Sequence, residues 1–452
     1  MMDNFEYSEE QKIAFNKYIQ GENIFITGPG GTGKTMLIKQ IKKHAEFSQS
    51  KKIKVCAMTG CAALLLSCQA KTLHSWSGIG LGNGTIDEQV NKVMKSIFKK
   101  TAWKDIDILV VDEVSMMSKK IFEMLDAIGK KIRKNSKAFG GIQVIFSGDF
   151  YQLPPVGNKD ETDTMRFCFE SELWKETFKT DNHIELKKIF RQKDQVYCNI
   201  LNEIREGRLR KSSYNKLMEQ VSKVNANENN FKPTKLFPIR SKGDIINKEE
   251  MDLLKEPEFI FESKIQVDLP ISEKEKEDKA KFTPEQIKAE LEYIQSNLLC
   301  EKIVRIKKGA QVMSIANIEY PNGIICNGSQ GIVKDFNEKG LPIVKFNSGF
   351  EITMNYHTWP SENIPGIGLI QIPLILSWAI TIHKSQGASL DCAEIDAGNS
   401  IFECGQTYVA LSRVKSLEGL FLTSFDVNKI RINKKVREFY ELLKEKKINP
   451  LV

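Results

Sequence analysis

The nine cysteines of this 452-residue sequence include no C-x-x-C pair, their number is odd and their spacing is irregular. The sequence therefore signals neither a disulfide framework nor a zinc site, and a reducing compartment fits it best. It also lacks a long uninterrupted apolar run, and it begins with the polar, acidic stretch MMDNFEYSEEQK. We therefore expect no membrane span and no secretory signal. No internal repeat recurs at a solenoid period.

The composition is that of an ordinary globular protein, with 41% hydrophobic and 27% charged residues. The length exceeds the size at which a single hydrophobic core keeps growing, so two or more domains are expected. The net charge is +8. A lysine-rich surface accounts for this excess of positive charge. The more specific interpretation is a polyanionic partner, which the net charge alone favours only weakly.

Short apolar runs alternate with helix-like stretches in the first half of the chain. The expected strands are Asn23–Gly28, Lys54–Thr59, Ile106–Val111 and Ile142–Ser147, and a helix is expected at Lys34–Ala45. This rhythm predicts an α/β fold in which a parallel sheet carries helices on both faces.

The same rhythm resumes near Thr234 and at Leu369–Ile382, which predicts a second α/β domain. Lys308–Met354 contains short β-like pieces separated by Gly and Asn, and it predicts a small β-barrel inserted in that domain. The charge-dense run Ser272–Ala289 is expected to be a solvated loop or an exposed helix. Val427–Lys447 predicts a basic amphipathic helix that docks against the body.

A phosphate-binding loop is predicted at Gly28–Thr35, which reads GPGGTGKT and fits G-x-x-x-x-G-K-[ST] between a strand and a helix. Glycines let successive backbone N–H groups turn toward phosphates, and the helix N-terminus adds its positive dipole end. Lys34 would reach the β- and γ-phosphates of ATP, and Thr35 would ligate Mg²⁺. The expected nucleotide-binding residues of the loop are Gly28, Gly30, Gly31, Thr32, Gly33, Lys34 and Thr35.

Two acidic residues, Asp112 and Glu113, follow the strand in the stretch LVVDEVS. Ligands of open α/β sheets bind at the carboxyl ends of strands, so Asp112 is expected to hold Mg²⁺ through water. Glu113 is expected to orient and deprotonate the attacking water. In IFSGDFYQLPP another strand ends at Gly148 and Asp149, and Gln152 is placed to sense the γ-phosphate or, alternatively, to cap a loop.

Together these motifs resemble superfamily-one helicases of the Pif type (petite integration frequency), relatives of the RecD-like helicases. The resemblance covers nearly the whole chain, and its motifs follow the family order. Phe122–Gln143 (FEMLDAIGKKIRKNSKAFGGIQ) is similar to the segment that marks this family between its second and third motifs.

The resemblance implies further nucleotide contacts. Gln11 in SEEQKIAF matches a glutamine that reads the adenine edge. Arg191 in KKIFRQ matches an arginine that reaches the γ-phosphate from the second RecA-like domain, and Arg413 in YVALSRV matches the arginine finger of the sixth motif. Arginine suits both roles because it stays charged and can donate two parallel bonds to phosphate. Without the resemblance, Arg413 would be interpreted as a surface or helix-end residue.

The resemblance also implies DNA-contacting loops. The matching residues are Thr59, Gly60, Ala62 and Ala63 (TGCAA), Thr72 and His74 (TLHS), and His383, Lys384, Ser385 and Gln386 (HKSQG). Taken alone, His74 and His383 are ordinary polar or core histidines. Hydroxyl contacts to phosphate oxygens position a strand without reading its sequence. Three aromatic residues near these loops, Trp76, Phe150 and Tyr151, are candidates for base stacking, with core packing as the alternative for Trp76.

The fold implied by the resemblance has two RecA-like parallel-sheet P-loop domains with a small β-barrel inserted in the second. The expected division is 1–182 for the first domain, 183–300 for the start of the second, 301–366 for the barrel and 367–452 for the remainder.

The expected function is an ATP- and Mg²⁺-dependent DNA helicase that moves 5′ to 3′ on single-stranded DNA, opens forked duplexes and serves DNA replication, repair, recombination or telomere maintenance. The alternatives are a nucleic-acid-stimulated ATPase without processive unwinding and a non-enzymatic recruitment module. We expect a resting monomer and an intracellular location, with the nucleus, the mitochondrion and viral or host cytoplasm left open.

Overall fold

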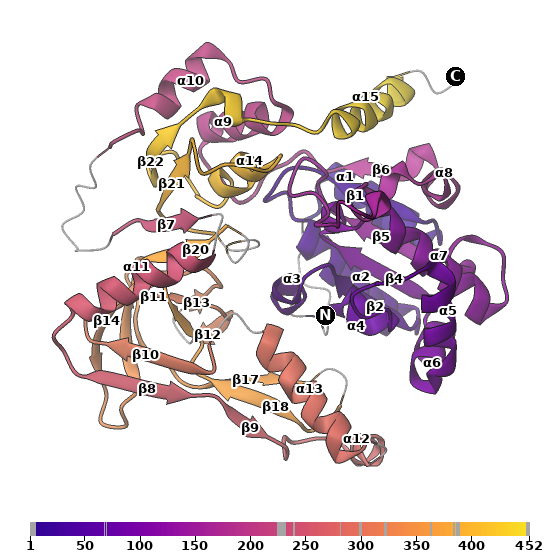
Figure 1. Cartoon of the computed structure of the whole chain (residues 1–452), viewed down its shortest axis with the longest axis horizontal. Coiled ribbons are helices and arrows are strands. Elements are labelled where there is room, and N and C mark those ends of the chain that lie inside the picture. Colours follow the sequence, from indigo (N-terminus) through magenta and orange to yellow (C-terminus); the bar gives the residue numbers. More distant parts are fainter. Residues whose placement is uncertain are drawn as a thin grey trace. The chain divides into compact units, whose positions relative to one another are not determined.

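The computed structural model describes residues 6–66, 68, 70–223, 232–237, 240–280, 282–297, 301–320, 323–361, 364–382, 385 and 389–448. Contacts between residues divide the chain into two compact units, and Figure 1 labels most of their elements. The first unit groups described residues of 1–209, 403–408 and 430–452, and the second groups those of 210–402 and 409–429. Within the described ranges, no helix is both long and apolar enough to cross a membrane.

The first unit is built on a six-stranded sheet in the order β3-β2-β4-β5-β1-β6, in which every pairing is parallel. Its strands are β1 (Ile24–Thr27), β2 (Ile53–Ala57), β3 (Lys71–Thr72), β4 (Ile108–Asp112), β5 (Gln143–Ser147) and β6 (His183–Glu185). The parallel α/β sheet expected from the sequence is confirmed. β6 extends it past the predicted boundary at residue 182, because these three residues pair with β1.

Both faces of this sheet are buried, which explains why every residue of β1, β4 and β5 is buried and why their central residues are apolar without alternation. Phe25 and Phe146 face one hydrophobic cluster, whereas Ile24 and Ile145 face another. The helices of this unit are α1 (Glu9–Ile19), α2 (Lys34–Ser48), α3 (Gly60–Leu66), α4 (Leu73–Ser77), α5 (Ile86–Lys95), α6 (Ile97–Asp105), α7 (Lys119–Arg133), α8 (Glu172–Thr177), α9 (Gln195–Glu206) and α15 (Lys434–Ile448).

The segment that marks the family resemblance has a structural role in this unit. The Asp126 carboxylate accepts the Phe139 backbone N–H at 2.8 Å, and Arg133 Nε donates to the Gly140 carbonyl at 2.9 Å. Phe139 lies in the left-handed region at φ 50°, a conformation that such contacts must hold in place. These residues therefore fix the entry into β5, which leads to the candidate site.

The second unit contains a four-stranded parallel sheet in the order β20-β7-β21-β22. Its strands are β7 (Thr234–Phe237), β20 (Ala379–Thr381), β21 (Ala393–Ala397) and β22 (Leu420–Phe425). The helices are α10 (Lys211–Met218), α11 (Arg240–Leu253), α12 (Glu273–Lys279), α13 (Pro284–Asn297) and α14 (Gln406–Leu411), of which the last begins among residues of the first unit. The charge-dense run is thus largely helical.

The inserted region has a five-stranded antiparallel sheet, β16-β15-β14-β11-β19, and three smaller sheets, β10-β8, β12-β13 and β17-β18-β9. The strands are β8 (Glu258–Glu262), β9 (Lys264–Gln266), β10 (Ile303–Lys307), β11 (Gln311–Ser314), β12 (Ile318–Tyr320), β13 (Gly323–Ile325), β14 (Gln330–Phe336), β15 (Pro342–Phe346), β16 (Glu351–Thr353), β17 (His357–Pro360), β18 (Gly368–Gln371) and β19 (Leu374–Leu376). The β character predicted for this region is confirmed, whereas closure into a barrel stays a prediction.

Candidate active site

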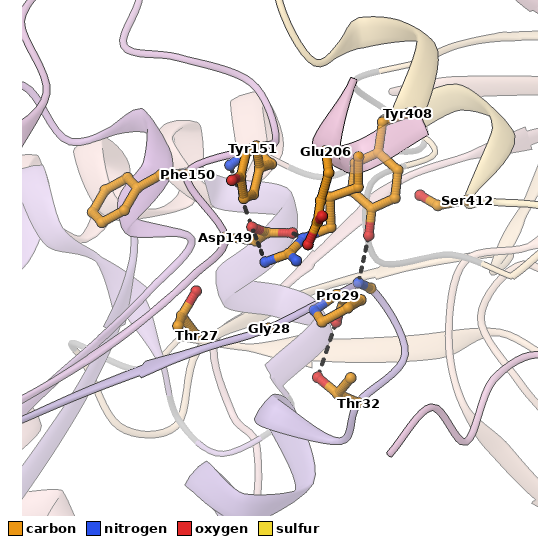
Figure 2. Close-up of polar contacts among 12 residues, drawn as sticks. Thr27, Gly28, Pro29, Thr32, Asp149, Phe150, Tyr151, Glu206, Tyr408 and Ser412 are labelled. Carbon is orange, nitrogen blue, oxygen red and sulfur yellow. Dashed lines mark hydrogen bonds and ion pairs between the residues drawn. The ribbon is translucent and has the colours of Figure 1, made fainter. Parts of the chain in front are cut away.

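The phosphate loop leaves β1 and enters α2 at Lys34, as the sequence predicts. Gly31 and Gly33 have φ of 83° and 82°, where side chains are strained. A Cβ atom on Gly31 would lie 2.5 Å from the Arg191 Cβ, and one on Gly33 would lie 2.7 Å from the Gln11 Nε2. Glycine is therefore required by both backbone shape and space. The Thr32 hydroxyl donates to the Pro29 carbonyl at 2.9 Å, which closes the turn (Figure 2).

The Lys34 ammonium lies over the loop, where its Nζ donates to the Gly28 carbonyl at 2.7 Å and to the Pro29 carbonyl at 2.9 Å. Burial lowers the pKa of Lys34. The nearby carboxylates that oppose this change in pKa are those of Asp149, Glu113 and Asp112. Residues predicted from separate motifs are thus brought around one lysine.

Asp112 ends β4, and its carboxylate accepts the Glu113 backbone N–H at 3.0 Å. Burial raises the pKa of Asp112, whereas the charge of Lys34 lowers it. A desolvated carboxylate gains from a cation, and its oxygen, like the Thr35 hydroxyl at the start of α2, is a hard ligand that suits Mg²⁺. In the described part of the chain no group of three His, Cys, Asp or Glu residues could hold a metal. By the chemistry of their oxygen atoms, Asp112 and Thr35 both fit Mg²⁺.

Glu113 has an unusual backbone for a non-glycine residue, with φ 58° and ψ 38°. Strained conformations of this kind cluster at functional sites, where the surrounding structure maintains them. Space is tight around this turn, because a Cβ atom on Gly148 would lie 2.9 Å from the Val114 nitrogen. The Glu113 carboxylate is near both Lys34 and Arg191, and it raises the pKa of each against the lowering by burial.

Arg191 belongs to the first unit, not to the second domain from which it was expected to reach the site. The reason is the path of the chain after β6, where Leu186 N–H donates to the Thr27 carbonyl at 2.8 Å. Phe190 N–H then donates to the Gly31 carbonyl at 2.8 Å. The segment therefore lies along the phosphate loop and places Arg191 beside it.

Gln152 lies three residues after Asp149 and is buried, and its backbone N–H donates to the Asp149 carbonyl at 2.9 Å. It follows β5, the strand between β1 and β4. The neighbouring Phe150 and Tyr151 are also buried, with Tyr151 stacked on Tyr440 at 4.6 Å between ring centroids. The structure thus shows these two rings in packing contacts and gives no support to base stacking.

Gln11 is fully buried between α1 and the phosphate loop. Its Oε1 accepts the Ser8 N–H at 2.9 Å, and its Nε2 donates to the Thr32 carbonyl at 3.3 Å. The amide nitrogen carries a second hydrogen that could serve an adenine edge. Phe190 was not singled out from the sequence, yet its ring carbons lie 3.6 Å from the position of a Cβ atom on Gly33, and the residue is 45% exposed.

The predicted DNA-contacting loops of the first unit lie at the carboxyl ends of β2 and β3, the same edge of the sheet as the phosphate loop. The Thr59 hydroxyl accepts the Ala62 N–H at 3.2 Å, and Gly60 begins α3. The Thr72 hydroxyl caps α4 by accepting the Ser75 N–H at 3.3 Å. Burial lowers the pKa of His74.

Trp76, the third candidate for base stacking, is buried in the core of the first unit. Its ring packs against Trp103 with 4.7 Å between centroids. The packing alternative is the one that the structure shows.

In the second unit, Arg413 is buried, and its Nε donates to the Val409 carbonyl at 2.9 Å. Its role as an arginine finger stays a prediction. Ser385 follows β20 and uses its hydroxyl to donate to the Ile382 carbonyl at 2.8 Å. His383, Lys384 and Gln386, predicted to contact DNA, lie outside the described residues.

Sequence reasoning missed residues that reach the site from late in the chain. The Tyr408 hydroxyl accepts the Gly30 N–H at 2.8 Å, so it engages a donor of the phosphate loop (Figure 2). Tyr440 of α15 contacts Thr27, and Arg205 of α9 pairs with Asp149 at 2.8 Å. The only local sign was the conspicuous YVALSR stretch around Tyr408. Arg205 and Tyr440 lie in ordinary helical sequence.

Comparison with protein families gives two matches. The family described as PIF1-like helicase matches residues 6–222, and the DNA helicase Pif1 2B domain matches residues 291–336. The ATP-dependent DNA helicase RRM3 of Saccharomyces cerevisiae is 32% identical over 96% of this chain and 67% of its own length. The ATP-dependent DNA helicase PIF1 of Xenopus laevis is 33% identical over 99% of this chain and 66% of its own length. The chain thus spans about two thirds of the length of these relatives.

Solved structures are similar over nearly the full chain. Pif1 helicase from Candida albicans has a TM-score of 0.73 and 32% identity, covering 97% of this chain and 100% of its own. Bacteroides Pif1 in complex with ADP-AlF4 has a TM-score of 0.78 and 27% identity, covering 98% of both chains. Bacteroides Pif1 bound to single-stranded DNA has a TM-score of 0.64 and 28% identity, covering 99% of both chains.

Proposed function

Because the chain belongs to the PIF1-like helicase family, we propose that it is an ATP-dependent DNA helicase that moves 5′ to 3′ on single-stranded DNA and opens duplex DNA. The observation that carries this proposal is the meeting of motifs at one site. Lys34 lies on the phosphate loop with the carboxylates of Asp112 and Glu113 near it, and Arg191 lies against the same loop.

The chemistry follows from these positions. Water attacks the γ-phosphorus of ATP, the bond to the β–γ bridging oxygen breaks, and ADP and inorganic phosphate form. Glu113 accepts the proton of the attacking water. Lys34 and Arg191 stabilise the charge that spreads over the phosphoryl oxygens. Thr35 and Asp112 would hold Mg²⁺, which neutralises charge on the β- and γ-phosphates.

The adenine base is assigned to the side of the phosphate loop where Gln11 and Phe190 lie. Gln11 would donate its remaining amide hydrogen to the base, and the exposed Phe190 ring would stack on it. Both residues lie beside Gly33, at the start of α2. This arrangement supports ATP as the substrate, because a phosphate loop alone does not select a base.

The DNA strand is assigned to the carboxyl edge of the first sheet, along Thr59, Gly60 and Ala62 and then Thr72 and His74. These loops follow β2, which pairs with the catalytic strand β4, and β3, which pairs with β2 at the edge of the sheet. Movement of β4 and its flanking loops during hydrolysis would reach the bound strand directly. The proposal includes 5′ to 3′ polarity and action on forked duplexes. It also includes a monomeric, intracellular enzyme that serves DNA replication, repair, recombination or telomere maintenance. The family resemblance supports them.

The test uses two partial duplexes that differ only in carrying a 5′ or a 3′ single-stranded tail. We expect ATP hydrolysis to rise on addition of single-stranded DNA and the 5′-tailed duplex alone to be opened. The Lys34→Ala variant is the control for contaminating activity. Stimulated hydrolysis without opening of either duplex would instead support a nucleic-acid-stimulated ATPase. Absence of both activities would refute the motor.

A further inference from the structure

The helix α15 completes the core of the first unit although it comes last in the described chain. Val436 and Tyr440 are 1% and 3% exposed and belong to the cluster that contains Phe25 and Phe150. Phe439 stacks on Phe169 with 4.4 Å between ring centroids. A phenylalanine ring at position 440 would fill the same space in this core, so the hydroxyl of Tyr440 needs a separate explanation.

That hydroxyl makes three hydrogen bonds. It lies 2.6 Å from the Thr27 Oγ1, accepts the Phe150 N–H at 3.2 Å and donates to an Asp149 carboxylate oxygen at 3.4 Å. A phenol has one hydrogen and two acceptor positions. Because its hydrogen goes to Asp149, the Thr27 hydroxyl must be the donor in the short contact. All hydrogen-bonding positions of the Tyr440 oxygen are then occupied.

Asp149 is fully buried and fixed from its other side. Arg205 donates to both carboxylate oxygens, at 2.8 and 3.0 Å. The guanidinium carbon lies 4.6 Å from the centre of the Tyr151 ring, which stacks on Tyr440 with an interplanar angle of 9°. Bidentate and stacked contacts of this kind restrict orientation strongly. The Tyr440 hydroxyl is therefore held in one orientation, beside the start of the phosphate loop. Figure 2 shows its two partners Thr27 and Asp149 there.

The two side chains that bond the Tyr440 hydroxyl, those of Thr27 and Asp149, lie at the start of two loops of the nucleotide site, the phosphate loop and the loop that carries Gln152. Thr27 is the last residue of β1 and directly precedes Gly28. Asp149 follows β5 closely and stands three residues before Gln152. We infer that Tyr440 is a positioning residue of the nucleotide site, through which α15 sets the spacing of the phosphate loop and the Gln152 loop. This inference rests on the proposed ATP site.

The test replaces Tyr440 by phenylalanine in the full chain, which removes the hydroxyl and keeps the stacked ring. We expect affinity for a fluorescent ADP analogue and kcat/KM for ATP each to fall about fivefold, the value of one ordinary hydrogen bond. Affinity for single-stranded DNA without nucleotide should stay unchanged. Thr27→Val removes the same bond from the other side, so it should give a similar loss, and the double variant should lose little more.

Tyr18→Phe is the matched control, because Tyr18 is a buried tyrosine whose hydroxyl bonds His44 at 3.0 Å near the far end of α2. It should leave ADP affinity unchanged. The inference is overturned if Tyr440→Phe and Thr27→Val both bind ADP within twofold of the wild type, or if Tyr18→Phe shows the same loss. The readout is ADP affinity, so a wild-type chain that binds ADP but opens no duplex would refute the proposed helicase alone.

Discussion

Replacing the buried Arg205 by methionine should destabilise the first unit far more than the same replacement of the exposed Arg208. Arg205 and its partner Asp149 are 3% and 0% exposed. Methionine preserves the length and helix propensity of the side chain. It leaves Asp149 buried without its bidentate cation. Breaking one side of such a pair costs about 3–5 kcal/mol, because the remaining charge stays desolvated.

For a unit of this size, that loss corresponds to a fall in Tm of about 6–20 °C, at about 2–4 °C per kcal/mol. Thermal melting with and without ADP measures it, because ADP should raise the transition of the unit that carries the phosphate loop. Arg208→Met is the matched control. Arg208 pairs with Glu441 at 3.4 Å, but these side chains are 66% and 50% exposed. Exposed pairs contribute about 0–1 kcal/mol. Equal shifts for the two variants would refute the assignment of a buried pair.

Other outcomes follow from the same site. Lys34→Ala should reduce ATP turnover by at least about a hundredfold, as loss of a charge-stabilising donor does, while circular dichroism stays unchanged; wild-type turnover would remove Lys34 from the reaction. Glu113→Gln should bind ATP with unchanged affinity in equilibrium titration but hydrolyse it slowly, and a loss of affinity would instead make Glu113 a metal ligand. Asp112→Asn should abolish hydrolysis yet raise the Tm of the nucleotide-free protein at pH 7. Burial raises the pKa of Asp112 above its ordinary value of 3.8, so the ionised carboxylate destabilises the fold at higher pH. The gain in Tm of the variant should therefore shrink as the pH falls toward 3.8. A gain in Tm that does not depend on pH would contradict this cause. Tyr408→Phe should tighten ADP binding a few fold, because the Gly30 N–H no longer has a hydroxyl partner to lose; weaker binding would show that the hydroxyl contacts nucleotide.

The sequence predicted what depends on local pattern. The strand that precedes the phosphate loop was expected at Asn23–Gly28 and lies at Ile24–Thr27. The helix that follows the loop begins at Lys34, as predicted. Glycine spacing and continuous apolar runs carry these signals. The edge strand β6 was missed, because its three residues HIE have no recognisable alternation.

The contacts that span the chain could not be predicted in the same way. Arg205 lies on α9 in the sequence LNEIREG, where an arginine near a helix C-terminus is usually solvated. Its pairing with Asp149 depends on how distant segments pack, and local residues do not encode that. Tyr440 was likewise expected only as part of a docking helix. The family resemblance supplied Gln11 and Arg191, but it assigned Arg191 to the wrong unit.

The first unit draws its core from segments separated by residues 210–402. During synthesis its six strands can pair as soon as β6 leaves the ribosome, but Val436 and Tyr440 are then still unmade. The cluster around Phe25 and Phe150 must wait for the whole intervening unit to be translated. A nascent chain halted before residue 434 should therefore expose this aromatic surface and attract chaperones. Among the described residues, the helix that is translated last thus completes the core of the unit that is translated first.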